Sequence, residues 1–331
     1  MLKLKRIRRT IMKEIYQKLY EIGIIPVIKI ENADDAVPLA KALIDGGLPA
    51  AEITFRTSCA AEAIKKITDA YPEMLVGAGT VLTTKQVDEA IAAGATFIVS
   101  PGLNPKTVAY CVEKNIPVVP GCSSPSDIEA AIELGLDTVK FFPAEAAGGL
   151  PMLKAMSAPY GNIKFMPTGG LNADNILSYL KFNKILCCGG SFMVKDELIK
   201  AGEFDKIAEL TRGAVNTLLG FEFAHIGINN PDDAAAKRGA ELLCKLFGFS
   251  PRETSKSIFA GNSFELMNSN GRGTMGHIGI KTNFVDRAIA YLKRIGVEID
   301  EETITYDDKG KPKFVYLKDE ICGFAIHLVT K

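Results

Sequence analysis

The amino-acid sequence predicts an α/β fold: a closed (β/α)8 TIM barrel followed by a smaller α+β domain of two βαβββ units. Up to about residue 220, the chain repeats a short apolar strand, a small loop and a helical period. Eight such units occur, and eight parallel strands close a barrel. From residue 221 this alternation of strands and helices stops, and the motif FAHIGINN recurs as MGHIGIKT. We therefore expect a barrel domain over residues 1–220 and a second domain over residues 221–331.

The composition is that of an ordinary globular protein, with 47% hydrophobic and 24% charged residues among 331. Lys+Arg and Asp+Glu balance at 39 each, so the chain as a whole has no net charge that would attract nucleic acid or a membrane surface. No apolar run approaches the roughly 18 residues of a membrane span. The seven cysteines lack C-x-x-C spacing, which indicates free thiols and a cytoplasmic location.

The first 23 residues, MLKLKRIRRTIMKEIYQKLYEIG, carry the one local excess of basic side chains. They fit either a targeting peptide or basic arm, or an amphipathic leader helix over residues 1–20 that covers the bottom of the barrel. The segment has no uninterrupted apolar stretch, and acidic residues fall within its helical pattern. These features favour the leader helix.

The eight predicted barrel strands are short and apolar. In chain order they read GIIPVIKI, AAEITF, MLVGAGT, TFIVSP, IPVVPG, DTVKFF, NIKFMPTGG and ILCCGG. Amphipathic stretches such as TTKQVDEAIAAG lie between them, and many end in Gly, the usual helix stop. An open doubly wound sheet is the alternative. Its dinucleotide loop would be GAGTVL, but that segment lacks the third glycine and the later acidic residue of such loops.

A lysine interrupts the sixth predicted strand. In a barrel, residues at the carboxyl ends of the strands face the active site. The polar residues at those ends are Lys29, Glu52, Thr54, Arg56, Thr80, Ser100, Lys140, Thr168 and Ser191. Lys140 differs from the others because Val139 and Phe141 flank it. It fits either a structural salt bridge, for instance with Glu52, or a desolvated amine that forms a Schiff base with a carbonyl.

The absence of histidine narrows the chemistry of the barrel. All three histidines follow residue 224, so proton transfer must use a carboxylate, a lysine or water. Glu52 is the strand-end carboxylate, and burial would raise its pKa into a useful range. A lysine that forms a Schiff base and a glutamate that transfers protons are the fewest side chains with which a class I aldolase can work. The glycine-rich strand ends PTGG and GGS predict a phosphate cradle of backbone N–H groups, with plain turns as the alternative.

The motifs EITFRT, VGAGTVL, SPGLNP, VKFFPAE, PTGG and GGS resemble those of the 2-keto-3-deoxy-6-phosphogluconate aldolases, over residues 20–217. The resemblance implies a homotrimer that needs no cofactor. It also implies cleavage of 2-dehydro-3-deoxy-6-phosphogluconate to pyruvate and glyceraldehyde 3-phosphate, and of 4-hydroxy-2-oxoglutarate to pyruvate and glyoxylate. The alternative is a non-catalytic sensor of sugar acid phosphates, which would need the arginine and the glycines but not the amine.

The resemblance further implies that Lys140 forms the Schiff base and that Glu52 is the general acid/base. Arg56 and Thr80 would hold the substrate carboxylate, and Pro101 and Phe142 would shape the pyruvate pocket. The phosphate would bind at Gly169, Gly170 and Ser191, and Lys29 completes the implied set of substrate-binding residues. Lys29 stands where the family often has arginine, so a point charge replaces a bidentate group.

The second domain is predicted from its internal repeat. Each copy opens with the repeated motif, continues with an amphipathic helix and closes on a hydrophobic strand, NSFELMNS or GFAIHLVT. This duplicated βαβββ unit resembles the vicinal oxygen chelate superfamily, the relatives of glyoxalases and extradiol dioxygenases, over residues 222–330.

That second resemblance implies a metal site on the first and last strand of each unit, at His225, Glu265, His277 and His327. Three imidazoles and one carboxylate suit zinc, iron(II), nickel or cobalt. Glyoxalase-type sites usually have glutamate at the last position, so their acid–base chemistry does not transfer to His327. The domain is then either a second enzyme, which polarises a dicarbonyl or hydroxy-ketone, or a degenerate module kept for assembly or ligand binding.

Overall fold

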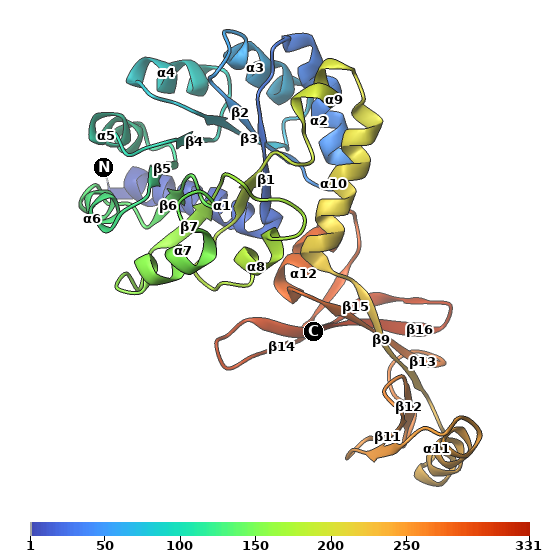
Figure 1. Ribbon diagram of the computed structural model, residues 1–331. Coiled ribbons are helices and arrows are strands. Elements are labelled where there is room, and N and C mark those ends of the chain that lie inside the picture. Colours follow the sequence, from blue (N-terminus) through green and yellow to red (C-terminus); the bar gives the residue numbers. More distant parts are fainter. Residues whose placement is uncertain (1) are drawn as a thin grey trace. The chain divides into compact units, whose positions relative to one another are not determined.

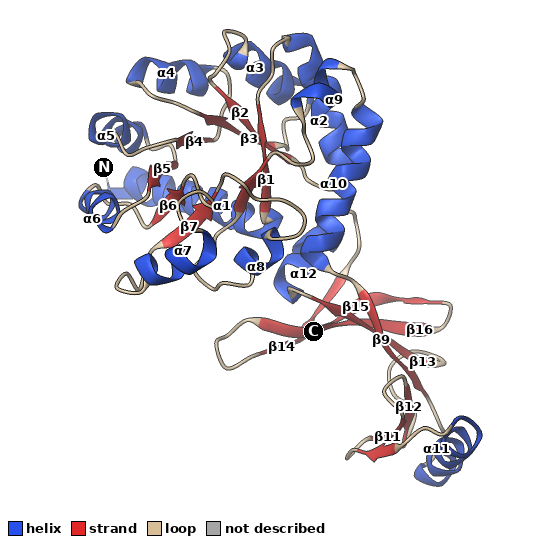
Figure 2. Ribbon diagram, in the orientation of Figure 1, coloured by secondary structure: helices blue, strands red, loops and turns tan. Residues whose placement is uncertain are grey.

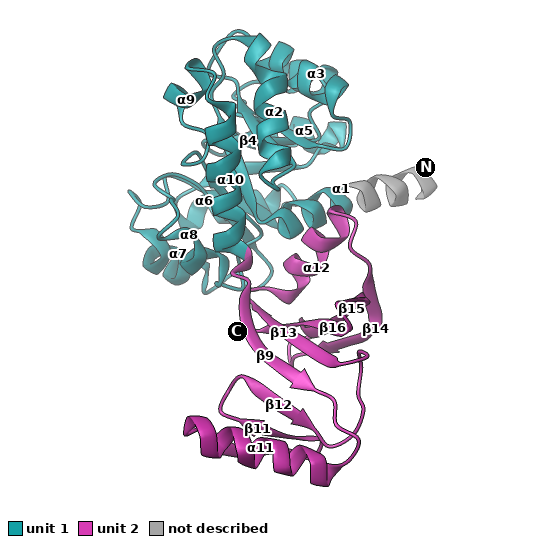
Figure 3. Cartoon of the chain, turned by 90° about the vertical axis from the view of Figure 1, so that its right-hand side faces the viewer, with its two compact units in different colours: residues 1–218 teal, residues 219–331 magenta. Residues whose placement is uncertain are grey.

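The computed structural model describes the backbone of residues 2–331 and the side chains of residues 12–331. The chain forms two compact units, Met1–Leu218 and Leu219–Lys331, coloured teal and magenta in Figure 3. The division falls two residues before the boundary that the sequence predicts. Within the described residues, no helix has both the length and the apolar character needed to cross a membrane.

The first unit is the predicted barrel. Its strands are β1 (Ile24–Ile28), β2 (Ala50–Thr54), β3 (Leu75–Gly79), β4 (Phe97–Ser100), β5 (Val118–Cys122), β6 (Thr138–Phe141), β7 (Lys164–Pro167) and β8 (Cys188–Gly190). They pair in the order β7-β6-β5-β4-β3-β2-β1-β8, and Figure 2 shows the strands in red. Single parallel bridges, Phe165 with Ile185 and Thr168 with Gly189, join the remaining edges. The parallel sheet therefore closes on itself, and the (β/α)8 prediction is confirmed.

Helices surround the strands of this unit (Figure 1). They are α1 (Leu2–Ile22), η1 (Ala33–Asp35), α2 (Ala36–Asp45), α3 (Ala60–Ala70), α4 (Thr84–Ala92), α5 (Pro105–Lys114), α6 (Pro125–Glu133), α7 (Gly149–Ser157), α8 (Ile176–Leu180), α9 (Asp196–Lys200) and α10 (Phe204–Leu219). Several begin at side-chain caps. At α6, the Ser124 hydroxyl accepts from the Asp127 amide while the Asp127 carboxylate accepts from the Ser124 amide, and Pro125 fits the first turn.

Helix α1 packs at the amino-terminal end of the strands. Leu19 is fully buried, and the Tyr16 hydroxyl donates to the carbonyl of Val118, the first residue of β5, at 3.4 Å. Burial raises the pKa of Tyr16. These contacts lie at the end of the barrel opposite to the carboxyl ends of the strands, where the predicted site residues are.

The second unit holds one mixed sheet built from two copies of a βαβββ unit. The first copy is β9 (Glu222–Ile228), α11 (Asp233–Phe247), β10 (Pro251–Glu253), β11 (Ser257–Ala260) and β12 (Phe264–Met267). The second is β13 (Gly276–Thr282), α12 (Val285–Arg294), β14 (Ile299–Tyr306), β15 (Pro312–Ile321) and β16 (Phe324–Thr330). The strand order is β10-β11-β12-β9-β13-β16-β15-β14. From the centre of the sheet outward, each copy therefore contributes its first, fourth, third and second strand in turn. The predicted α+β duplication is therefore present.

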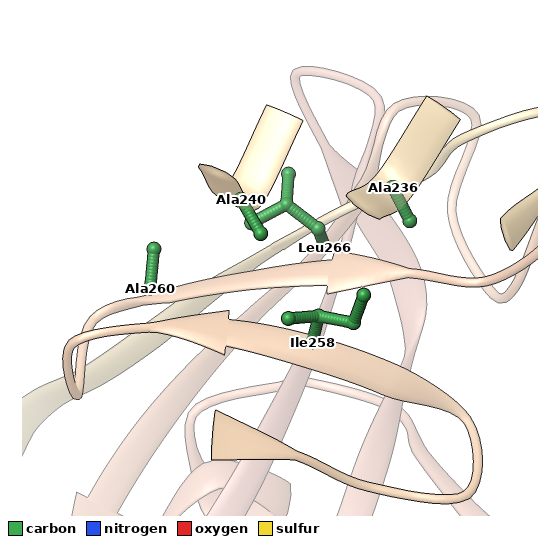
Figure 4. Close-up of a cluster of buried hydrophobic side chains, with 5 residues drawn as sticks. All are labelled: Ala236, Ala240, Ile258, Ala260 and Leu266. Carbon is green, nitrogen blue, oxygen red and sulfur yellow. The ribbon is translucent and has the colours of Figure 1, made fainter. Parts of the chain in front are cut away.

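Helix α11 covers one face of the first half of this sheet. Ala236 and Ala240 on the helix pack against Ile258, Ala260 and Leu266 on β11 and β12 (Figure 4). Successive side chains of a strand point to opposite faces. The neighbouring residues on β11 and β12 therefore point away from α11, and they include one of the four predicted metal ligands.

Candidate active site and candidate metal centre

Lys140 and Glu52 meet inside the barrel. Lys140 lies on β6 and Glu52 on β2, and the Lys140 ammonium donates to Oε1 of Glu52 at 3.5 Å. Lys140 is 5% exposed and Glu52 is 1% exposed. The second carboxylate oxygen of Glu52 is buried and has no hydrogen-bond partner. Because a buried, unsatisfied carboxylate oxygen is costly, this geometry suits a site that receives a hydroxyl or a water molecule.

Glu52 occupies the middle of its strand, and not the strand end that the sequence suggested. It is the third residue of β2 and pairs in register with Val27 and Gly77. Its side chain reaches toward the carboxyl end of the barrel because Gly79, on β3, leaves space for it. A Cβ atom at Gly79 would lie 2.3 Å from Oε1 of Glu52.

Two residues of the predicted pyruvate pocket lie near Lys140. The Lys140 nitrogen is 5.2 Å from the centre of the Phe142 ring, within the range of a cation–π contact. Gly121 pairs in register with Lys140, and a Cβ atom at Gly121 would lie 1.9 Å from the Pro101 carbonyl oxygen. The Pro101 backbone therefore passes directly over the strand next to Lys140, and only glycine permits that approach.

The predicted carboxylate-binding residues follow β2 and β3. Nε of Arg56 donates to the Thr54 hydroxyl at 3.1 Å, and that hydroxyl donates to the Ile28 carbonyl at 2.8 Å. Arg56 is exposed, so its remaining N–H groups face solvent or a ligand. Thr80 has φ of 56°, a left-handed conformation that is uncommon for a β-branched residue. Such strain is typical of functional positions.

The predicted phosphate-binding residues come from two adjacent loops. Gly169 and Gly170 have φ of 101° and 79°, which glycine adopts without strain. The bridge between Thr168 and Gly189 brings their loop next to β8, and Ser191 follows β8 and is exposed. The glycines of both loops leave backbone N–H groups uncovered by side chains, which fits the phosphate-binding site that the sequence predicts.

Glu145 supports the first of these loops, a role that sequence patterns did not suggest. Its amide donates to the Gly169 carbonyl at 3.0 Å, and its carboxylate accepts from the Tyr179 hydroxyl. A Cβ atom at Gly170 would lie 2.6 Å from Cβ of Glu145. Burial raises the pKa of Tyr179, and the hydrogen bond to Glu145 raises it further. The only sequence signal was the position of Glu145 in the motif VKFFPAE.

Lys29 is paired with acidic neighbours. Its ammonium lies 2.5 Å from a Glu31 oxygen and 3.9 Å from an Asp196 oxygen. The hydrogen bond with Glu31 raises the pKa of Lys29. Since these carboxylates already compensate the charge, the structure gives Lys29 less weight as an anion-binding group than Arg56.

In the second unit, all four predicted metal ligands converge. Nε2 of His225 lies 3.1 Å from Nε2 of His277 and 3.3 Å from Nε2 of His327. Oε2 of Glu265 lies 3.2 Å from Nε2 of His225 and 3.1 Å from Nε2 of His277. The three histidines form the one group in the described part of the chain whose ligand atoms have the spacing of a metal site.

Two glycines make this convergence possible, one from each copy of the repeat. Gly227 pairs in register with both Glu265 and His277, and Gly279 with both His225 and His327. A Cβ atom at Gly227 would lie 2.0 Å from the His277 ring. One at Gly279 would lie 2.8 Å from the His225 ring and 2.9 Å from the His327 ring. The glycine of each repeated HIG motif therefore provides the space for the histidine of the other.

The pKa values of His225, Glu265 and His327 favour the binding of a cation between these side chains. Burial lowers the pKa of His327 to about 3, and burial also lowers the pKa of His225. Burial opposes ionisation of Glu265, but hydrogen bonds from His277 and from Ser257, at 2.6 Å, outweigh it and lower the pKa of Glu265. The Nε2 atoms of the three histidines and a Glu265 oxygen therefore meet at one point, where a bound cation would replace the hydrogen bonds between them.

Aromatic side chains surround the histidines, and arginines lie over two of the aromatic rings. The Phe259 ring is 5.8 Å from the His225 ring, and the Tyr316 ring is 5.3 Å from the His327 ring. The Arg252 guanidinium is 4.0 Å from the Phe259 centroid. The Arg272 guanidinium is 4.9 Å from the Tyr316 centroid. Sequence reasoning missed both arginines, because neither lies on a strand that hydrophobic alternation reveals.

Comparison with known proteins assigns the first unit to a protein family. The family model for KDPG and KHG aldolase matches residues 15–210. The 2-dehydro-3-deoxy-phosphogluconate aldolase of Treponema pallidum is 47% identical over 201 residues, which are 61% of this chain and 96% of the relative. The enzyme of the same name from Haemophilus influenzae is 47% identical over 206 residues, 62% of this chain and 97% of the relative.

A solved structure shows the same fold with a covalent ligand. The KDPG aldolase of Legionella pneumophila, with pyruvate captured at low pH as a covalent carbinolamine intermediate, has a TM-score of 0.58 and 40% identity. The match covers 60% of this chain and 97% of that one. The family model ends at residue 210, before the second unit begins.

Proposed function

Because the chain belongs to the KDPG and KHG aldolase family, we propose that its barrel works through the buried pair of Lys140 and Glu52. The activity is that of a class I aldolase, a carbon–carbon lyase that cleaves 2-dehydro-3-deoxy-6-phosphogluconate to pyruvate and glyceraldehyde 3-phosphate. The 3.5 Å contact between the two side chains is the observation that supports this assignment most directly. A salt bridge of purely structural role would have the same geometry, and the family relationship favours the enzymatic interpretation.

In the proposed mechanism, Lys140 is the nucleophile. Transfer of its proton to Glu52 leaves a neutral amine, which attacks the C2 ketone of the substrate. Glu52 then gives this proton to the hydroxyl of the tetrahedral carbinolamine, which leaves as water. A protonated imine and an ionised Glu52 result. This imine withdraws electrons from the neighbouring carbon–carbon bond. The barrel wall, with Phe142 beside the amine, keeps water from competing for the ketone.

Glu52 moves the protons. Its carboxylate takes the proton of the C4 hydroxyl, the C3–C4 bond breaks, and the bond electrons pass to the imine to form an enamine. Glyceraldehyde 3-phosphate leaves. Glu52 then returns the proton to C3, directly or through water, and hydrolysis of the imine releases pyruvate and regenerates Lys140. The buried second oxygen of Glu52, which has no hydrogen-bond partner, supports this role because it offers a free acceptor for the hydroxyl.

The remaining residues would bind the two ends of the substrate. Arg56 and Thr80 hold the carboxylate, and Pro101 and Phe142 shape the pocket for the pyruvate half. The backbone N–H groups of Gly169 and Gly170, with Ser191, hold the phosphate, while Lys29 lies at the rim and is paired with Glu31. Their common position at the carboxyl ends of the strands supports these roles.

We further propose 4-hydroxy-2-oxoglutarate as a second substrate, cleaved to pyruvate and glyoxylate by the same steps. It lacks a phosphate, so the glycine cradle would bind it less well and its KM would be higher. The sensor alternative is not favoured, because a sensor requires neither an amine nor a general base in a buried position.

Borohydride trapping tests the covalent step. Reduction of the protein in the presence of pyruvate should add one pyruvate-derived mass, and peptide mapping should place it on Lys140. Comparing turnover of the phosphorylated and the unphosphorylated substrate then measures what the glycine cradle contributes. A reduced adduct on another lysine, or none at all, would overturn the assignment of Lys140.

For the second unit, we propose a vicinal oxygen chelate fold with a divalent metal bound by His225, Glu265, His277 and His327. Zinc–nitrogen bonds of about 2.0–2.1 Å place two nitrogens on one ion roughly 2.9–3.4 Å apart. The distances of 3.1 and 3.3 Å between histidine nitrogens fit that range without rearrangement. Zinc, iron(II), nickel and cobalt all suit this donor set. When bound, such an ion would polarise a carbonyl or hydroxyl oxygen.

Metal analysis tests this second proposal. Purified protein should contain close to one divalent ion per chain, and the His225→Ala/His277→Ala double variant should contain almost none. Metal that survives the double substitution, or its absence from the unmodified protein after incubation with zinc or cobalt, would contradict the proposed site. Borohydride trapping in the double variant should be unchanged, because the aldolase needs no metal.

We also propose that the protein is a homotrimer, as its family resemblance implies. Large apolar side chains remain exposed on neighbouring parts of the barrel surface, and they suit contacts between copies: Leu82, Ile91, Val112 and Ile132. Light scattering coupled to size-exclusion chromatography should give three times the mass of one chain, and a monomeric mass would contradict the proposal.

A further inference from the structure

We propose that the metal centre of the second unit takes an anionic chelating ligand: a carboxylic acid with a neighbouring hydroxyl or oxo group. In this proposal Arg252 and Arg272 attract and orient the carboxylate. The inference rests on the metal site proposed above, because it concerns the ligand of that same site. It differs from the neutral dicarbonyl or hydroxy-ketone that metal chemistry alone would also allow.

Two rows of side chains cross the sheet on the face opposite α11. The first row runs in register from Arg252 through Phe259, Glu265 and Gly227 to His277. Residues opposite each other in a sheet point to the same face. Arg252 and Phe259 therefore share a face with the metal ligands.

The second row repeats the first in the other half of the unit. It runs from Asp300 through Tyr316, His327 and Gly279 to His225. The position that Arg252 holds in the first row is taken by Asp300 in the second. Arg272 bonds to this aspartate at 2.7 Å, so a guanidinium is present on both sides of the centre.

Each guanidinium lies over an aromatic ring that contacts the histidines. Arg252 is over Phe259 and Arg272 is over Tyr316, at 4.0 and 4.9 Å from the ring centres. Stacking on a ring restricts a guanidinium while leaving its edge free to bind a carboxylate with two parallel hydrogen bonds. The aromatic rings thus hold the arginines beside the centre.

The charge of the centre favours a negative ligand. A divalent ion with one glutamate and three neutral imidazoles carries one net positive charge. Arg272 is paired with Asp300, whereas no ion pair joins Arg252 to a carboxylate of the described residues, so the charge of Arg252 adds to that excess. The charges of Lys281 and Arg252 are also close enough to act on His225. An anion is attracted by all of these groups, whereas a neutral ketone gains only from the metal.

Chelation fixes the second feature of the ligand. Four protein ligands leave two positions on a six-coordinate ion. A carboxylate oxygen and an adjacent hydroxyl or oxo oxygen would fill both positions in one ring. A further carboxylate on the same molecule would then extend toward an arginine. Hydroxy-dicarboxylic and oxo-dicarboxylic acids combine all of these properties.

Cobalt-loaded full-length protein provides the test, since the visible spectrum of bound cobalt reports on ligands at this centre alone. L-malate should change the spectrum in a saturable way, and the neutral chelator 1,2-propanediol should not do so at the same concentrations. Arg252→Gln should weaken malate binding roughly tenfold, because it removes a charge-assisted hydrogen bond. Arg272→Gln should weaken it less, because Asp300 already pairs with that guanidinium. Cobalt affinity should stay unchanged in both variants.

Arg238→Gln is the matched control. It makes the same change in charge at an exposed position of α11, the helix on the opposite face of the sheet, and should leave malate binding unaltered. Equal malate affinity in the unmodified protein and the Arg252→Gln/Arg272→Gln double variant would overturn this inference while leaving the metal site intact. Failure of cobalt to bind at all would overturn the metal proposal and this inference together.

Discussion

The two units of the chain place reactive side chains on buried strand positions by the same device, but with different donor atoms. In the barrel, Gly79 leaves space for Glu52, which meets a lysine. In the second unit, Gly227 and Gly279 leave space for three histidines, two of which contact Glu265. A single amine facing a single carboxylate suits covalent chemistry on a ketone. Converging imidazoles suit a metal. The neighbouring glycine decides where a site can form, and the donor set decides what the site does.

The largest expected effect is a loss of turnover in the barrel, with metal binding in the second unit unchanged. Lys140→Arg keeps a positive charge but removes the nucleophile, so turnover should fall about 10⁴-fold or more while the fold is retained. Steady-state assay and circular dichroism measure the two properties. Lys140→Met serves as a second variant in case arginine does not fit the buried position. Cobalt binding by the second unit should be unchanged, and a joint loss would show that the sites depend on each other.

The next prediction concerns the glycine beside Glu52. Gly79→Ala places a methyl group where the carboxylate now lies, so Glu52 must turn away and turnover should fall about 10²-fold or more. Borohydride trapping of pyruvate should be less affected than cleavage, because Lys140 is untouched. Gly161→Ala is the control, since its Cβ would meet nothing within 4 Å. Equal activity of the two variants would contradict the proposed role of Gly79.

The corresponding change in the second unit is Gly227→Ala. The added methyl group would lie 2.0 Å from the His277 ring, so His277 must leave the cluster. Cobalt affinity should fall roughly 10- to 100-fold, as expected when one ligand is misplaced. Isothermal titration calorimetry measures it, with Gly239→Ala on α11 as the control because only Leu266 is near that position, at 3.5 Å. Aldolase turnover should not change.

The smallest expected difference is in the response of the metal-free protein to acid. Folding holds the pKa of His327 at about 3, against 6.5 for an ordinary histidine, so the unfolded chain binds more protons between these values. Stability of the second unit should therefore decrease as the pH falls from about 6.5 toward 3. The lowered pKa values of His225 and Glu265 act in the same direction.

The barrel contains no histidine, so this source of acid sensitivity is absent from it. Hydrogen exchange at pH 7 and pH 5 should show earlier loss of protection in the second unit than in the barrel. Equal loss in both units would contradict the explanation based on buried histidines. Added zinc should increase the protection of the second unit at pH 7.

Much of this organisation could be predicted from the sequence, because the signals were local. Lys140 stood out among apolar neighbours, and the repeated HIG motif revealed the duplication and contains two of the four proposed ligands. The positions that sequence reasoning missed depend on pairing between strands. Arg252 lies on a three-residue strand with exposed side chains, and no local pattern shows that it faces the same way as Glu265. Likewise, nothing local shows that Gly79 lies against Glu52.

The reciprocal arrangement of the HIG motifs makes the two repeats depend on each other. The glycine of one repeat accommodates the histidine of the other, and each repeat carries only two of the four converging side chains. A repeat folded alone would need a second molecule to bring four such side chains together. Because both repeats lie in one chain, their meeting does not depend on protein concentration.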